Sequence, residues 1–89
     1  MTCYIATFEV ANDQDKEALT ERLKGYGIYC PINANCWAFL SEQNAVQIRD
    51  NLMSVIKTTD KIFVIKSGVE AAWRNAYGDQ NSEWLKEKL

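Results

Sequence analysis

Histidine is absent from the 89-residue chain. This absence removes the commonest general base, together with every Ser/His or Cys/His catalytic pair. The three cysteines, Cys3, Cys30 and Cys36, include no C-x-x-C pair, so the sequence also argues against a zinc site. We interpret these cysteines as small buried thiols rather than reactive groups or disulfide partners. An enzyme built on this chain would have to work with carboxylates, lysines or tyrosines.

Long hydrophobic runs are absent too, since none approaches the roughly 18 residues of a membrane span. The N-terminus shows no basic segment followed by a cleavage site, so we expect a cytoplasmic protein without a membrane segment. Ten basic residues against twelve acidic ones give a net charge of −2. That balance argues against a broad nucleic-acid-binding surface and leaves room only for a local basic patch.

What the sequence does contain is a set of strand-like segments that are apolar on both faces. Residues 3–10, 36–40 and 62–65 show almost no alternation between apolar and polar side chains. The side chains at odd and at even positions of these strands, which point to opposite faces of the sheet, therefore both favour burial. Because two helices can cover only one face of a sheet, we expect a second cover, either a second copy of the chain or the segment after Ser67.

The periodicity predicts a first strand at 3–10 and a first helix that begins at Asn12 or Asp13 and ends at Gly25. Residues 28–32 are predicted as an edge strand because they contain Pro31, and residues 33–35 as the turn of a hairpin to a strand at 36–40. The apolar stripe of the helix comprises Leu19, Leu23 and Tyr26.

A second helix is predicted to begin at Ser41 as its N-cap and to end at 58–60. Residues 61–66 then form a fourth strand, flanked by lysines that protect a sheet edge. The apolar stripe of the second helix comprises Ala45, Ile48, Leu52, Val55 and Ile56.

The order βαββαβ predicts an α+β, ferredoxin-like fold, in which the first and third strands occupy the centre of an antiparallel sheet and both helices lie on one side. We expect a single domain over 1–89, with 67–89 as a C-terminal helical extension. The extension begins with a capping-box pattern at 67–70 and carries Trp73 and Trp84 at helix spacing.

Several stretches resemble small bacterial proteins of the SinR-like family, which in turn is similar to the CRISPR-associated Cas2 and VapD fold group. The stretches that carry the resemblance are 4–10 (YIATFEV), 47–52 (QIRDNL), 60–64 (DKIFV), 70–73 (EAAW) and 83–86 (EWLK). Together they cover nearly the whole chain. The resemblance implies a ferredoxin-like protomer that forms a dimer through its sheet.

The Cas2 and VapD resemblance also implies a divalent metal between two protomers. In that group an aspartate at the end of the first strand approaches its symmetry mate and can hold a metal ion for phosphodiester cleavage. The matching residue here is Glu9, whose carboxylate would hold Mg²⁺ or Mn²⁺. Its side chain is one methylene longer than aspartate, and a misplacement of about 1 Å can lower a rate roughly a hundredfold. This departure argues against efficient cleavage.

Each candidate site residue also has a structural interpretation. Glu9 could be a solvated strand end or the partner of a lysine, and the hydroxyl of Thr7 is expected to be buried against backbone. Arg49 could grip phosphate, or lie beside Asp50 on a solvated helix face. Arg74 beside Trp73 could hold a single-stranded base, although the spacing of Trp73 favours a core position.

Lys66, with Lys57 and Lys61, could form a basic rim for nucleic acid or protect the sheet edge. Tyr4 and Tyr29 are expected to anchor the cover of the sheet.

The function that these observations favour is a non-catalytic, homodimeric Cas2-like module that acts by association with itself and with a protein or nucleic acid. The alternative is a metal-dependent endonuclease with paired Glu9 carboxylates across the dimer, and Arg49, Lys66 and Arg74 as nucleic-acid-binding residues. A third hypothesis, a small-molecule sensor, has no residue that marks a ligand. The sequence points to no certain cofactor.

Overall fold

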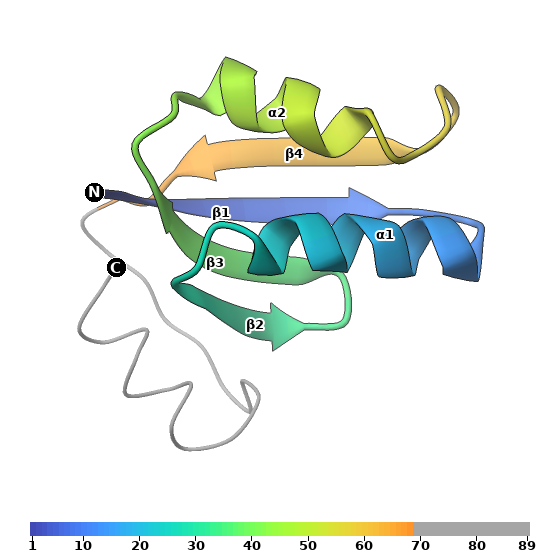
Figure 1. Cartoon of the computed structure of the whole chain (residues 1–89), viewed down its shortest axis with the longest axis horizontal. Helices are drawn as coiled ribbons and strands as arrows, with labels where there is room; N and C mark the ends of the chain where they lie inside the picture. Colours follow the sequence, from blue (N-terminus) through green and yellow to red (C-terminus); the bar gives the residue numbers. More distant parts are fainter. Residues whose placement is uncertain (69–89) are drawn as a thin grey trace.

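The computed structural model describes residues 1–68 of the chain, which form a four-stranded sheet and two helices. In chain order the elements are β1 (Thr2–Glu9), α1 (Asp13–Lys24), β2 (Tyr29–Asn33), β3 (Cys36–Ser41), α2 (Ala45–Met53) and β4 (Lys61–Lys66). The strand order is β2-β3-β1-β4, and every neighbouring pair is antiparallel. The fold is therefore α+β, with β1 and β3 at the centre as predicted. Both helices lie on the same side of the sheet (Figure 1).

The predicted C-terminal helix, with Trp73, Arg74 and Trp84, lies outside the described residues. Within the described part of the chain, neither helix has the length and apolarity needed to cross a membrane.

Helix α1 begins where the sequence predicts. The side chain of Asn12 accepts hydrogen bonds from the backbone N–H groups of Gln14 and Asp15 at 2.8 and 3.1 Å, which satisfies two donors at the helix start. Gly25 is its C-cap, and Gly27 follows with a φ of +91°, a conformation that a side chain would strain. The helix therefore ends in a short turn that leads directly into the edge strand β2.

The prediction that Ser41 caps the second helix is wrong. Ser41 is the last residue of β3 and pairs with Thr2, and the N-cap is Asn44. Asn44 and Gln47 form a reciprocal capping box, in which each side chain accepts from the other's backbone N–H at 2.9 Å. Ser41 instead accepts a hydrogen bond from Gln43 N–H at 3.0 Å and helps the chain turn away from the sheet.

Helix α2 is also shorter than predicted, because it ends at Met53 rather than at 58–60. The hydroxyl of Ser54 donates to the carbonyl of Asn51 at 2.6 Å and closes the last turn. Val55 and Ile56 lie beyond the helix and still pack against the core, so their burial does not depend on helical spacing.

The main core lies between the sheet and the helices. Aromatic rings from two neighbouring strands form its centre, with Phe39 fully buried and stacked against Tyr26 at 4.8 Å and Tyr4 at 6.3 Å between ring centroids. Tyr29 stacks on Trp37 at the edge of the same layer. Tyr4 thus anchors the covered face, as predicted, whereas Tyr29 is 37% exposed and only borders it. The other buried members of this core are Ala6, Phe8, Leu19, Leu23, Ile48 and Leu52.

Candidate functional site

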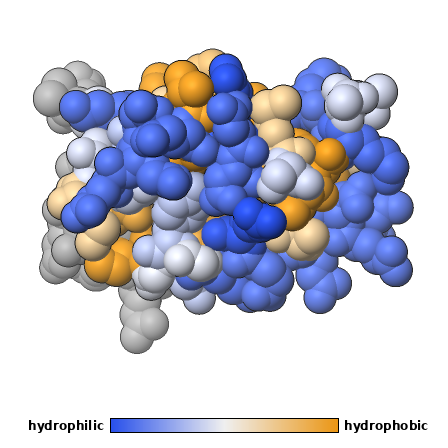
Figure 2. Space-filling model, turned by 45° about the horizontal axis from the view of Figure 1, so that its top comes forward, coloured by the Kyte–Doolittle hydropathy of each residue, from blue (hydrophilic) through white to orange (hydrophobic). Residues whose placement is uncertain are grey.

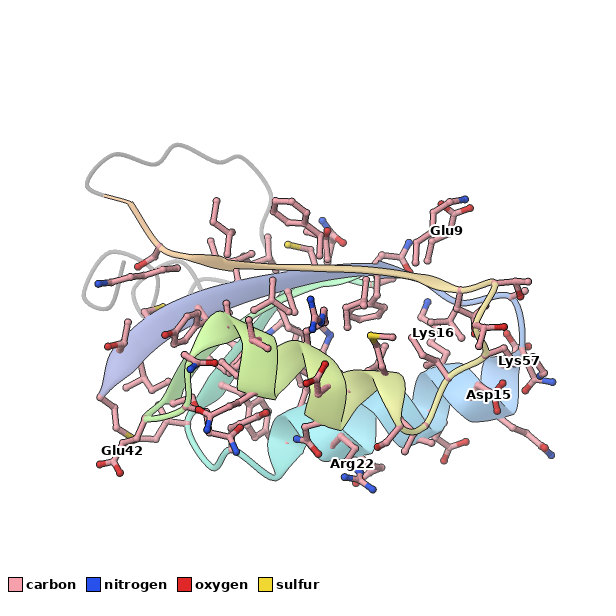
Figure 3. All side chains as sticks on the ribbon, turned by 90° about the horizontal axis from the view of Figure 1, so that it is seen from above. Glu9, Asp15, Lys16, Arg22, Glu42 and Lys57 are labelled. Atoms are coloured by element: carbon pink, nitrogen blue, oxygen red, sulfur yellow. The ribbon has the colours of Figure 1, made fainter. Side chains whose placement is uncertain are left out.

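The second face of the sheet, the one turned away from the helices, carries the predicted site residue Glu9 (Figure 3). Strand alternation and register place together the side chains that point to this face. They are Cys3, Ile5, Thr7 and Glu9 of β1, Cys30 and Ile32 of β2, Cys36, Ala38 and Leu40 of β3, and Lys61, Phe63 and Ile65 of β4. The sequence prediction of a two-faced sheet is confirmed, because apolar side chains dominate here as well.

This face has a buried part and an exposed part. Cys3, Cys30 and Ala38 form a small buried cluster, with partly buried aliphatic side chains packed around it. Along β4, by contrast, the side chains of Phe63 and Ile65 are 60% and 47% exposed. Two large apolar residues in water on neighbouring positions of one face are an unusual feature for a small domain.

A depression of about 500 Å³ lies at the end of β1. Thr7 and Glu9 line it from β1, Lys61 and Phe63 from β4, and Asn35 from the hairpin turn. The turn is fixed against β1 because Phe8 N–H donates to the carbonyl of Asn35 at 2.9 Å. The site therefore combines a carboxylate, an ammonium group, amides and an exposed aromatic ring.

Glu9 and Lys61 lie opposite each other on β1 and β4, with 3.9 Å between carboxylate and ammonium. Both side chains are largely exposed, at 79% and 77%, so the pair contributes little to stability. Thr7 is exposed, so the prediction that its hydroxyl is buried is wrong. It sits near the end of β1, where its cross-strand neighbours Cys36 and Phe63 leave it open to solvent.

The described residues of one protomer do not form a metal site by themselves, since no three His, Cys, Asp or Glu side chains among them gather around a point. Glu9 brings one carboxylate to the depression, and its nearest charged neighbour is a cation. A divalent cation held by protein prefers several oxygen ligands. A single protomer therefore does not fit Mg²⁺ or Mn²⁺ at Glu9.

The three thiols lie on this second face, and burial raises the pKa of each. For Cys3, a hydrogen bond with Ser67 opposes the effect of burial on the pKa without cancelling it, and for Cys30 the neighbouring Cys3 adds to it. A thiol with a raised pKa stays protonated at neutral pH and is a poor nucleophile. The interpretation of these cysteines as small buried thiols holds for Cys3 and Cys30, whereas Cys36 is only partly buried.

The predicted nucleic-acid-binding residues do not gather around Glu9. Arg49 lies on α2, on the other side of the sheet, and its guanidinium donates twice to one Asp50 oxygen at 3.1 and 3.0 Å. Lys66 is exposed at the end of β4 opposite to Lys61. Arg74 lies outside the described residues. Lys57 donates a hydrogen bond to Asp15 at 2.9 Å, which raises the pKa of Lys57. Because its charge is paired with Asp15, Lys57 does not contribute to the predicted basic rim with Lys61 and Lys66.

Sequence reasoning missed the contribution of the hairpin turn to the depression. The signal was present, because antiparallel pairing of β1 with β3 brings the start of β3 and the preceding turn beside the end of β1. Asn33 and Asn35 therefore belong to the same site as Glu9. Comparison with known proteins adds nothing to this site, since no protein-family model matches the chain and no curated protein is significantly similar to it.

Proposed function

We propose that this chain is a Cas2-like, ferredoxin-like module that works by self-association, as a homodimer joined through the second face of its sheet. The observation that carries the proposal is the exposure of Phe63 and Ile65 on a face that is mostly apolar. Burial of one such side chain contributes roughly 1.5–3 kcal/mol, so two copies meeting here would bury four.

The dimensions of the face suit a second copy of the chain. A spacing of about 4.8 Å between strands and a rise of about 3.3 Å per residue make a four-stranded face roughly 20 Å wide and 20 Å long. The area of such a face is similar to that of the largest apolar patches on monomeric proteins, which are often functional. A two-fold interface needs a surface that complements itself. Here the apolar centre is bordered at one end by charges of both signs, Glu9 and Lys61.

Sedimentation velocity of the full chain tests the proposal. We expect twice the monomer mass at micromolar concentration, and at least a tenfold weaker dimer for Phe63→Glu, because a carboxylate buried in an apolar interface is costly. Val46→Glu is the matched control, since Val46 is similarly exposed, at 54%, but lies on α2 at the helix side. A monomer at every accessible concentration, or equal weakening by both variants, would contradict a dimer through this face.

A metal-dependent nuclease is the second candidate, and one observation favours it. Glu9 projects from the proposed interface face and is exposed there (Figure 3). If the two-fold axis passes near the end of β1, the partner's Glu9 would supply the second carboxylate that one protomer lacks. In that arrangement Lys61, now 3.9 Å from Glu9, would be the nearest cation for a phosphate.

Labelled single- and double-stranded RNA and DNA, incubated with Mg²⁺, Mn²⁺ or chelator, separate the two candidates. A nuclease predicts metal-dependent cleavage that is lost in Glu9→Gln and retained in Glu42→Gln, a carboxylate on the helix side. Absence of cleavage by a dimeric preparation would leave the association module. Binding of uncleaved nucleic acid, weakened by Lys66→Gln, would then identify its partner class.

A further inference from the structure

A larger depression, about 870 Å³, lies on the helix side of the molecule. It runs between the C-terminal end of α1 and the loop before α2, with Ala18 and Val55 among its apolar lining residues and Arg22 and Glu42 among its charged ones. We call it the helix groove. Figure 3 shows Arg22 and Glu42 on the side of the sheet opposite to Glu9. Its volume falls in the range of about 300–1,000 Å³ that is common for small-molecule sites.

Four side chains that line the helix groove form one chain of hydrogen bonds. Arg22 Nη1 donates to Asn51 Oδ1 at 2.6 Å, and Asn51 Nδ2 donates to the hydroxyl of Tyr26 at 2.9 Å. That hydroxyl donates to Gln43 Oε1 at 3.1 Å. The ring of Tyr26 is itself held by stacking on the fully buried Phe39. Tyr26 therefore links this hydrogen-bond chain to the core, while Arg22 and Gln43 at its two ends are exposed.

The hydrogen-bond chain leaves an excess of donors. Every bond in it uses an acceptor of Asn51, Tyr26 or Gln43, while the Gln43 amide N–H groups and the other N–H groups of Arg22 have no acceptor among residues 1–68. Arg22 makes no ion pair with any carboxylate among residues 1–68. The hydrogen-bond partner of its guanidinium within residues 1–68 is the uncharged amide of Asn51. Of the two glutamates in the lining, Glu21 contacts Lys24 at 3.4 Å.

We propose that the helix groove is a binding site for a small anionic ligand, a carboxylate or phosphate attached to an apolar body. Arg22 binds the anion through charge-assisted hydrogen bonds, and the apolar body lies against Ala18 and Val55. Asn51 and Tyr26 act as positioning residues, because they hold the guanidinium in place before the ligand arrives. The site lies on the helix side, so its existence does not depend on self-association through the second face.

The test is an NMR titration of the full chain that follows the side-chain amides of Asn51 and Gln43 and the Nε–H of Arg22. The probes are benzoate and phenyl phosphate, with neutral benzamide as the control for the apolar body. We expect saturable shifts of these three resonances with one or both anions at millimolar concentration, and none with benzamide. Benzoate against phenyl phosphate then decides between a carboxylate and a phosphate ligand.

Variants assign the binding to Arg22. Arg22→Gln should weaken it about tenfold or more, because the charge-assisted hydrogen bonds are lost. Arg49→Gln, which removes a second exposed arginine on the helix side, should leave it unchanged. Glu42→Gln should strengthen it by removing a negative charge from the groove. Tyr26→Phe keeps the ring and should weaken binding several-fold, since Asn51 then loses the acceptor that orients it.

The proposal is overturned if neither anion gives saturable shifts of the groove resonances, if benzamide binds as well as benzoate, or if Arg22→Gln binds like the unmodified chain. Retention of the amide spectrum by each variant shows that the fold is intact and that a loss of binding is local. Because the readout is ligand binding, a monomeric chain would contradict the proposed dimer while leaving this test valid.

Discussion

The two faces of the same sheet are both apolar but are built in different ways. The helix-side face is filled by large side chains, with Phe39, Leu19 and Leu23 fully buried, and the helices cover its centre. The second face is built from small side chains at one end, such as Cys3 and Ala38, and from exposed large ones along β4. Burial on the first face stabilises the fold. On the second face much of the apolar area is left uncovered by residues 1–68.

The outer surface of the helix layer makes a further contrast. Viewed from the side of α2 and β4, the molecule is mostly hydrophilic, and its hydrophobic residues form separate patches (Figure 2). Scattered single apolar residues of this kind are normal on a protein surface. Val46 and Met53 on α2 are exposed in this way, while Phe63 and Ile65 project from the second face on one strand. The continuity of the apolar area, rather than its amount, distinguishes the second face.

The largest expected change in stability comes from substituting a buried phenylalanine, compared with the same substitution of an exposed one. Phe39→Ala should lower the free energy of unfolding by about 3–5 kcal/mol, because it leaves a cavity among Tyr4, Tyr26 and the helices. Phe63→Ala should lower it by less than about 1 kcal/mol, since its ring is already in solvent. Urea unfolding at concentrations where the chain is monomeric gives both numbers. Equal losses would mean that the two faces contribute equally to the fold.

A second matched pair uses adjacent residues of β1 that point to opposite faces. Ala6 is fully buried against the core, so Ala6→Leu should destabilise by about 1–3 kcal/mol through overpacking. Thr7 is exposed, and Thr7→Leu should change stability by no more than about 0.5 kcal/mol. The same urea experiment measures both. A Thr7→Leu variant as unstable as Ala6→Leu would show that the second face is packed in the monomer.

The loss of stability that begins at about pH 8.5 should come from the second face, because the three thiols with raised pKa values lie there, whereas the raised pKa of Lys57 on the helix side acts at higher pH. A group whose pKa is raised by folding contributes stability below its unfolded pKa, about 8.5 for cysteine, and loses it as pH rises through the folded value. Unfolding free energies at pH 7, 8, 9 and 10 should therefore be level at first and fall above about pH 8.5.

The control for the pH series is the triple variant Cys3→Ala, Cys30→Ala, Cys36→Ala. This variant should flatten the fall, because the thiols that release protons are gone. If the variant kept the full alkaline slope, other groups would be responsible and the thiols would have no part in the effect.

The smallest expected change in stability concerns two ion pairs, one on the helix side of the sheet and one on the second face. Lys57 bonds Asp15 at 2.9 Å, and the Asp15 side chain is only 28% exposed, whereas Lys61 and Glu9 are 3.9 Å apart and largely exposed. Lys57→Met should lower the melting temperature slightly at low salt, and the difference should shrink in 1 M NaCl as screening removes the attraction. Lys61→Met should leave the melting temperature unchanged at both salt concentrations. The reverse order would contradict this ranking of the pairs.

Local sequence signals predicted much of the architecture. The start of α1 at Asn12 or Asp13, the edge position of Pro31 and the bounds of β4 all follow from nearby residues and were predicted correctly. The error at Ser41 has a non-local cause, because the pairing of Ser41 with Thr2 extends β3 through a position that looks like a helix cap. A serine's capping preference is worth about 1 kcal/mol, and a strand pairing can override it.

The candidate sites were less predictable for the same reason. Glu9 was identified from the sequence, but its neighbours in the depression come from the hairpin turn and from β4, which are distant along the chain. The contact between Arg22 and Asn51 joins two different helices and leaves no local pattern. Thr7 was expected to be buried because its neighbours in the sequence are apolar, and only the finished sheet shows that its end of the face is open.

The central position of β1 also has a consequence for how the chain folds during synthesis. β1 is the first strand to be made, yet one of its two neighbours is β4, the last of the described strands. Pairing between segments so far apart in sequence slows folding, because a long loop must close before the contacts form. Until β4 emerges from the ribosome, one edge of β1 stays unpaired, and its apolar side chains are at risk of wrong contacts. Rapid translation of the last strand would therefore favour correct folding.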